Sequence, residues 1–315
     1  MFLHAEERAD FRVKKSDHIV DDSGSALGLR VFPTAIRLAG LRGAYGLLYL
    51  VGAWHALFDS AAVRDALAYL GRRFPGDDRL RQRWNVYRLF LARGRSLIDR
   101  CHLRNGGRFN YTRIGFEAVP PLLHEGRGLI VLSSHAGDWQ ASFVAIENWN
   151  KPLHVLLWRD EHPVPAEKTR ITGGLSVPAD VRVINAEGSL GGLLESMQAL
   201  QEGGVVCIMG ERNSDARKVA AKFLGQPAQF PCGAFLIAHA AQCPVAVLLS
   251  AKTGTRDYEF RIAGIIEPRP GESTVAFLER GVQGYATLLE RHFEEHPYQC
   301  FLFRDIWNFQ SPVTA

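Results

Sequence analysis

Cysteine is scarce in this chain of 315 residues. The five cysteines are odd in number and are never spaced as Cys-x-x-Cys; they are Cys101, Cys207, Cys232, Cys243 and Cys300. This pattern argues against a disulfide framework and against a thiolate zinc site. The sequence therefore predicts a protein of a reducing compartment without a metal site.

Motifs of two common enzyme classes are missing. The Gly-x-Ser-x-Gly nucleophile elbow of α/β-hydrolases does not occur, because GSLGG at 188–192 and GSALG at 24–28 carry their serine in the wrong place. The phosphate-binding patterns GxGxxG and GxxxxGK[ST] are also absent. A serine hydrolase and a nucleotide-dependent enzyme are therefore disfavoured.

The chain has little excess charge and no signal-peptide segment at its start. The formal net charge is only +4, and no Lys/Arg-rich tract with interleaved aromatic residues occurs, so nucleic acid is not an expected partner. Residues 1–26 lack the apolar segment of a signal peptide and predict a flexible arm.

One apolar run stands out. The stretch GAYGLLYLVGAWHALF, residues 43–58, contains no Asp, Glu, Lys or Arg and follows Arg30, Arg37 and Arg42. Its 16 residues fall short of the roughly 20 needed to span a bilayer. The basic flank and the aromatic residues favour a helix that lies in the membrane surface. A buried helix of a soluble core remains the alternative.

An arginine-rich segment follows at 71–100, with nine arginines. On a helix that begins near Asp78, Arg81, Arg88 and Arg95 share one face. The apolar residues of an adjacent stripe are Trp84, Tyr87, Leu91 and Ile98. The basic face suits anionic lipid head groups or an acidic carrier protein, although many charged helix faces are merely solvated.

Beyond Gly126, short apolar runs alternate with helical patterns. The runs that predict buried strands are 128–134, 153–158, 181–186, 205–209 and 244–251; helical spacing occurs at 139–149, 189–202 and 231–242. This alternation predicts an α/β fold with a mostly parallel sheet flanked by helices. Residues 258–266 add an antiparallel strand, and 273–295 form a final helix. We expect 105–315 to be an α/β unit that forms one domain with a helical, membrane-associating segment at 27–104.

His135 lies just after the predicted strand 128–134, in SSHAGDWQ. The carboxyl ends of parallel strands are where open α/β sheets place their sites. Asp138 is positioned to cap a helix that begins at Trp139, whose N-terminal N–H groups would stabilise negative charge near the histidine. The arrangement suits a general base that promotes attack on an acyl group, although a histidine at a strand end can also be structural.

SSHAGDWQ resembles the histidine motif, His-x4-Asp/Glu, of the lysophospholipid acyltransferase superfamily. The similar branch contains the bacterial lipid A late acyltransferases and the phosphatidylinositol mannoside acyltransferases, whose motif commonly runs His-x-Gly-Asn-Trp-Glu or Asp. His135, Gly137 and Trp139 match this motif, whereas Asp138 replaces Asn and Gln140 replaces the acid.

Three further blocks carry the resemblance in the same order. EGSLGGLLESMQALQEGGVVCIMGER at 187–212 is similar to the helix, glycine-rich turn and strand that lead to an acidic-basic pair. KFLGQPAQFPCGAFLIAHAAQCPV at 222–245 resembles the block Phe-Phe-Gly-x-x-Ala-x-x-Pro-x-Gly, with matches at Phe223, Gly225, Ala228, Pro231 and Gly233. HPYQCFLFRDIWNF at 296–309 resembles the Pro-x-Gln-aromatic close.

The resemblance implies direct acyl transfer. The histidine takes a proton from the acceptor hydroxyl (or amine), which attacks an acyl thioester without an acyl-enzyme. The implied donor is an acyl carrier protein or coenzyme A thioester, and the implied acceptor is a lipid or glycolipid. We also expect no cofactor apart from this acyl thioester as co-substrate. The implied location is the cytoplasmic face of the inner membrane, as a peripheral or monotopic protein.

A base of this kind needs an anionic partner, which fixes the tautomer and stabilises the imidazolium. Gln140 offers an amide oxygen but no charge. Glu211 falls at the acidic-basic pair of the resemblance, two strands along the predicted sheet, so our hypothesis is a dyad of His135 and Glu211. Gln140 is then a second contact of the histidine, and Asp138 is a weaker candidate for the charge partner.

The remaining candidates concern the substrate. The resemblance places Arg212, Phe223 and Gly225 near it, although Arg212 can equally form a structural ion pair. Asp138 is also a candidate for binding substrate. Arg159, at another predicted strand end, is a candidate for binding an anionic group. The rival interpretation is a silent relative that binds a lipid or a carrier protein without turnover, and Gln140 is the reason for considering it.

Overall fold

The computed structural model describes residues 28–104, 106–124, 126–138, 146, 149–157, 181–186, 192–210, 217–302 and 306–307. The predicted arm at 1–26 and most of the predicted helix at 139–149 therefore lie outside the described residues.

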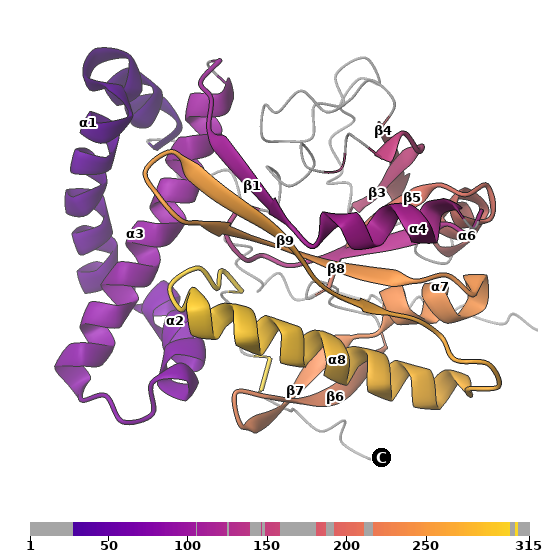
Figure 1. The fold of residues 1–315 in the computed structure, drawn as a ribbon. Coiled ribbons are helices and arrows are strands. Elements are labelled where there is room, and N and C mark those ends of the chain that lie inside the picture. The colour runs from indigo at the N-terminus through magenta and orange to yellow at the C-terminus, as the bar shows by residue number, and fades with distance from the viewer. Residues whose placement is uncertain are drawn as a thin grey trace, which may run out of the picture.

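A seven-stranded sheet forms the centre of the molecule (Figure 1). Its strands are β1 (Asn110–Ile114), β2 (Leu129–Ser133), β3 (Leu153–Leu157), β4 (Val181–Asn185), β5 (Val205–Met209), β8 (Val245–Lys252) and β9 (Asp257–Ile266). They lie in the order β1-β9-β8-β2-β5-β3-β4, and only the β8–β9 pair is antiparallel. The predicted α/β fold and the antiparallel strand are confirmed. Strand β1 was not predicted, because its mostly exposed residues give no apolar run.

Helices cover both faces of the sheet, which explains why its central strands read as continuous apolar runs. Every residue of β2 is buried, with Ile130 and Leu132 in one core and Leu129 and Val131 in the other. The first core also receives α6 (Leu193–Gln201), α7 (Gly233–Ala241) and α8 (Thr274–Glu295). The second receives α4 (Val119–His124), which follows a short 3-10 helix at Phe116–Ala118, and part of α1 (Gly28–Phe58).

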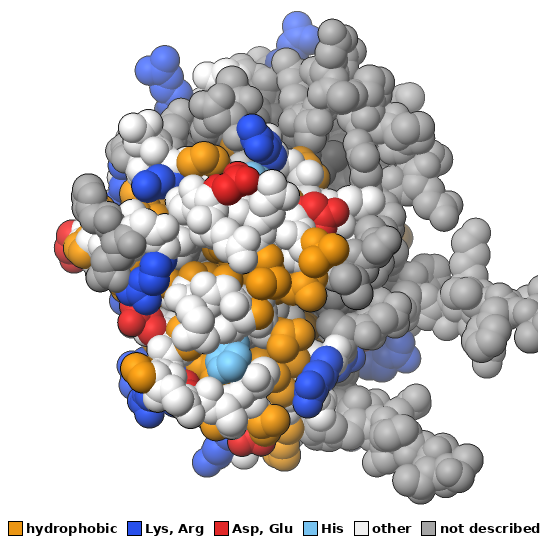
Figure 2. Space-filling model, turned by 90° about the vertical axis from the view of Figure 1, so that its right-hand side faces the viewer, with side chains coloured by type: hydrophobic (Ala, Val, Ile, Leu, Met, Phe, Trp, Pro, Cys, Tyr) orange, Lys and Arg blue, Asp and Glu red, His pale blue; other side chains and the backbone are white. Residues whose placement is uncertain are grey.

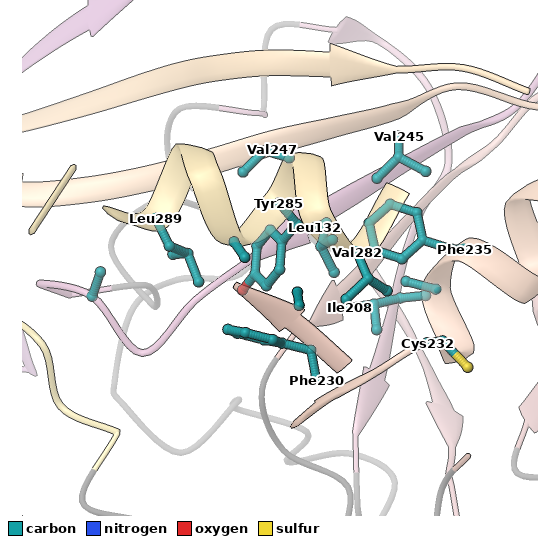
Figure 3. Close-up of a cluster of buried hydrophobic side chains, with 14 of the residues drawn as sticks. Leu132, Ile208, Phe230, Cys232, Phe235, Val245, Val247, Val282, Tyr285 and Leu289 are labelled. Atoms are coloured by element: carbon teal, nitrogen blue, oxygen red, sulfur yellow. The ribbon is translucent and has the colours of Figure 1, made fainter. Parts of the chain in front are cut away.

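Tyr285 of α8 lies in the middle of the first core, close to Leu132 of β2, Ile208 of β5 and Phe230 (Figure 3). Its hydroxyl donates a hydrogen bond of 3.0 Å to the carbonyl oxygen of Ser133. A helix residue therefore reaches the carboxyl end of the strand that leads to His135. On the side that carries α4, α6 and α7, apolar, basic and acidic side chains are interspersed (Figure 2).

A separate two-stranded sheet, β6 (Lys218–Phe223) and β7 (Gln226–Pro231), packs on α8. Its two-residue loop has positive φ at both positions, 49° at Leu224 and 77° at Gly225. Positive φ at both central residues is typical of a type I′ hairpin turn, which favours glycine. Phe223 is fully buried and stacks on Trp307, with ring centroids 5.6 Å apart. The predictions made from the sequence did not include this hairpin.

The three N-terminal helices are α1, α2 (Ser60–Arg73) and α3 (Arg79–Arg104), and α1 packs beside α3 (Figure 1). The helix predicted at 43–58 is the second half of α1, which is kinked at Gly40, where φ is 66°. Gly94 permits the close packing, since a Cβ there would meet Leu48 at 2.3 Å. The predicted start of α3 is confirmed: an oxygen of Asp78 accepts the backbone N–H of Arg81 at 2.8 Å.

Part of the apolar stripe predicted on α3 is exposed. Leu91 and Ile98 are buried, but Trp84 is 59% exposed. The large apolar side chains at the adjoining ends of α1 and α3 are also exposed: Leu50, Trp54, Leu57, Phe58 and Leu80. None of the described helices is by itself long and apolar enough to cross a membrane. One pair, Val31–Phe58 with Ser60–Arg73, passes that test jointly and is bent by 91°.

Replacement of Phe223 by alanine tests the packing of the hairpin on α8. We expect Phe223→Ala to lower the free energy of unfolding by about 3 to 5 kcal/mol, because it removes a buried ring and leaves a cavity. Leu194→Ala, at a site 59% exposed, is the control and should change it by about 0.5 kcal/mol at most. Equal effects of the two substitutions in urea unfolding would contradict this packing role.

Candidate active site

His135 lies two residues beyond β2 and is buried, with 4% of its surface exposed. The segment around it pairs with the chain near residue 300. Ala136 and Cys300 form an antiparallel bridge, and the Phe301 N–H donates to the His135 carbonyl at 3.0 Å. The Gly137 N–H donates to the Gln299 carbonyl at 3.1 Å. The histidine is therefore held by rigid backbone on a strand end, as general-base chemistry requires.

Gly137 is required by its surroundings. Its φ is 58°, and a Cβ there would lie 2.3 Å from the carbonyl oxygen of Ser250 on β8. The Ser250 hydroxyl in turn donates to the Ala136 carbonyl at 2.8 Å. A side chain at position 137 would push the histidine segment away from the sheet, which explains the glycine in the motif.

Asp138 is fully buried and forms an ion pair with Arg100 of α3, with Nε 3.3 Å from Oδ1. The predicted capping of a helix at Trp139 concerns residues outside the described part of the chain. The pairing with Arg100 was not anticipated, since the arginines of this segment were interpreted as a surface face. Arg100 instead attaches α3 to the segment that carries His135.

The neighbouring residue, Asp99, is the centre of a second buried cluster. Its carboxylate accepts hydrogen bonds from the hydroxyls of Tyr45 and Tyr258 and lies 2.6 Å from Nζ of Lys252. Burial raises the pKa of the Asp99 carboxyl, and Lys252 opposes that shift. Spacing along the chain does not indicate this cluster, because its members are far apart.

The two carboxylates also act on Tyr111 of β1. Burial raises the pKa of Tyr111 to about 12, and the carboxylates of Asp138 and Asp99 contribute to the shift. The carboxyl edge of the sheet thus carries paired charges on several elements. Within the described ranges, no group of His, Cys, Asp and Glu is arranged to hold a metal ion.

Glu211, Gln140, Arg159 and Arg212 lie outside the described residues, so their side chains are not placed. The backbone that leads to Glu211 is placed. Strand β5 pairs directly with β2, with Ser133 opposite Met209, so it is not two strands away as the sequence suggested. Ser133 and Met209 are partners in this pairing. His135 comes two positions after Ser133, and Glu211 comes two positions after Met209.

The contacts of Gly210 also hold the end of β5 beside the end of β2. Its N–H donates to the Ser133 carbonyl at 2.9 Å, and a Cβ at this position would lie 2.3 Å from the hydroxyl oxygen of Tyr285. Only glycine leaves room for both contacts. The chain therefore leaves β5 close to the strand end that carries the histidine.

The block at 222–245, which resembles the family pattern, has mainly structural positions in the fold. Phe223 lies in the aromatic core and Gly225 in the hairpin turn. Cys232 is buried at the start of α7, where burial raises the pKa of its thiol, so a reactive thiolate is disfavoured.

The Asp99 cluster can be tested by removing its cation. Lys252→Met leaves a carboxylate buried without its counter-charge, so we expect the free energy of unfolding to fall by about 3 to 5 kcal/mol. Adding Asp99→Asn in the same chain should restore a large part of the loss. If urea unfolding shows the two variants to be equally unstable, the pair does not act as described.

Comparison with known proteins identifies the family. The family model described as "Bacterial lipid A biosynthesis acyltransferase" matches residues 49–308, which include His135, the β6–β7 hairpin and the 296–302 segment. A search of curated proteins finds no match. Since the match covers most of the chain, the protein belongs to the bacterial lipid A biosynthesis acyltransferase family.

Proposed function

We propose that the protein transfers a fatty or polyketide-like acyl chain from a thioester donor to a hydroxyl, or an amine, of a lipid or glycolipid. The donor is an acyl carrier protein or coenzyme A thioester. The observation that carries the proposal is the buried His135 on a strand end in a member of this family, with β5 in direct register beside it.

In the proposed step, the imidazole of His135 removes the proton of the acceptor hydroxyl. The oxygen forms a bond to the thioester carbonyl carbon, and the resulting tetrahedral intermediate loses the thiolate. The imidazolium returns the proton to the sulfur, so the products are an acyl ester and a free thiol. Glu211 is the proposed charge partner of the imidazolium, and Gln140 a second, uncharged contact.

The other candidates have supporting roles. Arg212 and Arg159 are proposed to bind anionic groups of the substrates, as guanidinium groups do well. Asp138 is already paired with Arg100, so its proposed role is to position the His135 segment. Phe223 and Gly225 are proposed to act through the shape of the hairpin rather than by touching substrate.

Membrane association at the cytoplasmic face of the inner membrane is part of the proposal. The exposed side chains Leu50, Trp54, Leu57 and Phe58 recur at helical spacing on α1, and Trp84 lies at the adjoining end of α3. Arginines flank Trp84 in the sequence RLRQRW, residues 79–84. Exposed apolar and aromatic side chains next to cations suit a helix that lies in the interface of an anionic membrane.

Acyl transfer is tested with radiolabelled acyl-carrier protein and acyl-coenzyme A and a total lipid extract from the producing cell. We expect His135→Ala and Glu211→Gln to lower transfer about 10²- to 10⁴-fold, the usual contribution of general-base catalysis. Gln140→Glu should retain it. Glu202→Gln, an exposed acid at the end of α6, is the control.

The rival interpretation, a silent relative that binds a lipid or carrier protein, gives a different result. Wild type would then transfer nothing, and Gln140→Glu would gain activity. Undiminished transfer by Glu211→Gln would assign the charge partner to another residue while leaving the acyltransferase activity intact.

The membrane-binding face is tested by co-sedimentation with vesicles of phosphatidylglycerol and phosphatidylethanolamine. Burial of one large apolar side chain contributes about 1.5 to 3 kcal/mol, so Trp54→Ser with Leu57→Ser should weaken binding at least tenfold. Val275→Ser, at a site 56% exposed on α8, should bind like wild type. An equal loss of vesicle binding in the double variant and in Val275→Ser would show that this face does not determine membrane binding.

A further inference from the structure

A cavity of about 560 Å³ lies between the N-terminal helices and the end of α8. Its lining includes Tyr45 and Tyr49 from α1, Arg88 and Arg95 from α3, and Lys252 at the end of β8. The volume is within the range of sites for small ligands. Two of the three arginines predicted to share a face of α3 therefore line one cavity, and Arg81 does not line it.

The two arginines are held by aromatic residues and not by carboxylates. The Arg88 guanidinium lies 4.0 Å from the ring centroid of Tyr298 and donates to its hydroxyl at 3.1 Å. Arg95 donates to the hydroxyl of Tyr49 at 3.2 Å. Among the residues that the structure describes, neither arginine forms an ion pair with an acid. Their remaining N–H groups are available to a ligand.

The acids near the cavity lie beside other cations. Glu295, which lines it, lies 3.4 Å from the guanidinium of Arg261, which also binds Glu259 at 2.7 Å. Asp99 is paired with Lys252. Burial lowers the pKa of Lys252, Asp99 opposes the shift, and the positive charge of Arg95 adds to it. The cavity thus has excess positive charge.

The cavity borders the segment that carries His135. Gln299 lines it, and the amide of this side chain pairs with the backbone of Lys252 at 2.8 and 2.9 Å. The carbonyl of the same residue accepts the N–H of Gly137, and Phe301 donates to the His135 carbonyl. The segment around Gln299 therefore lies between the cavity and the segment that carries His135.

From these contacts we infer that the cavity binds a phosphate ester group of a substrate, through Arg88 and Arg95. A phosphate carries up to two negative charges and several acceptor oxygens, which suit guanidinium donors, and the tyrosine rings pack against the rest of the ligand. That the ligand is a substrate rests on the proposed function; that it is a phosphate ester does not.

Binding is measured by titration calorimetry on the full chain in detergent, without turnover. The probes are inorganic phosphate, coenzyme A and dihexanoyl phosphatidate, with dihexanoylglycerol as the phosphate-free control. We expect wild type to bind coenzyme A or the phosphatidate more tightly than the control. Coenzyme A as the better probe would indicate the thioester donor, and phosphatidate a lipid. Each of Arg88→Gln and Arg95→Gln should weaken binding about tenfold, the value of one charge-assisted hydrogen bond.

Arg81→Gln is the matched control, because it removes an arginine of the same helix outside the cavity. It should bind like wild type, and circular dichroism should show that every variant is folded at the temperature of the titration. The inference is overturned if wild type binds no phosphate probe, if Arg88→Gln and Arg95→Gln bind normally, or if Arg81→Gln weakens binding equally. A protein that binds phosphate without transferring acyl chains would refute the proposed function alone.

Discussion

Two consecutive residues of α3 carry opposite charges into the interior, and the arrangement of the molecule depends on both. Asp99 pairs with Lys252 at the end of β8, and Arg100 pairs with Asp138 three residues beyond His135. Burial of either charge alone would cost several kcal/mol. The N-terminal helices and the carboxyl edge of the sheet are therefore interdependent, and α3 is joined by ion pairs to the edge that carries the candidate active site.

The proposed dyad of residues far apart in the sequence depends on the parallel pairing of β2 with β5. His135 and Glu211 are 76 positions apart in the sequence, yet the residues that precede each by two are opposite one another in the register. Gly210 and Tyr285 keep the second strand end close to the first. The sheet therefore fixes the backbone geometry on which the proposed chemistry depends.

The sequence predicted the elements that depend on local pattern. The apolar runs that became β2, β5 and β8 and the capped helices α3 and α8 were predicted because burial on both faces and side-chain caps leave local signs. Strand β1 and the β6–β7 hairpin have no continuous apolar run that would predict them. The residues of β1 are mostly exposed, and those of the hairpin alternate between exposed and buried positions.

Within the candidate site, sequence reasoning proposed the histidine as the base but did not predict the residues that hold its segment in place. Arg100, Lys252 and Gln299 come from three separate elements, and no spacing along the chain indicates that they meet. The resemblance predicted the acyltransferase family, which the family match confirms, while the tertiary pairing of charges follows only from the fold. The same limit applied to the arginine face of α3, where spacing alone could not distinguish the two cavity-lining arginines from Arg81.

The ion pair of Asp138 with Arg100 gives a structural reason for one of the two departures from the histidine motif. Relative to the pattern His-x-Gly-Asn-Trp-Glu, the chain has its acid at position 138 and an amide at position 140. The negative charge has moved by two residues, but at position 138 it is buried against Arg100. A carboxylate already committed to a guanidinium stabilises an imidazolium less, because its charge is largely balanced. The acid of the motif at position 138 therefore has a structural partner, which is consistent with our proposal that Glu211, after β5, is the charge partner of His135.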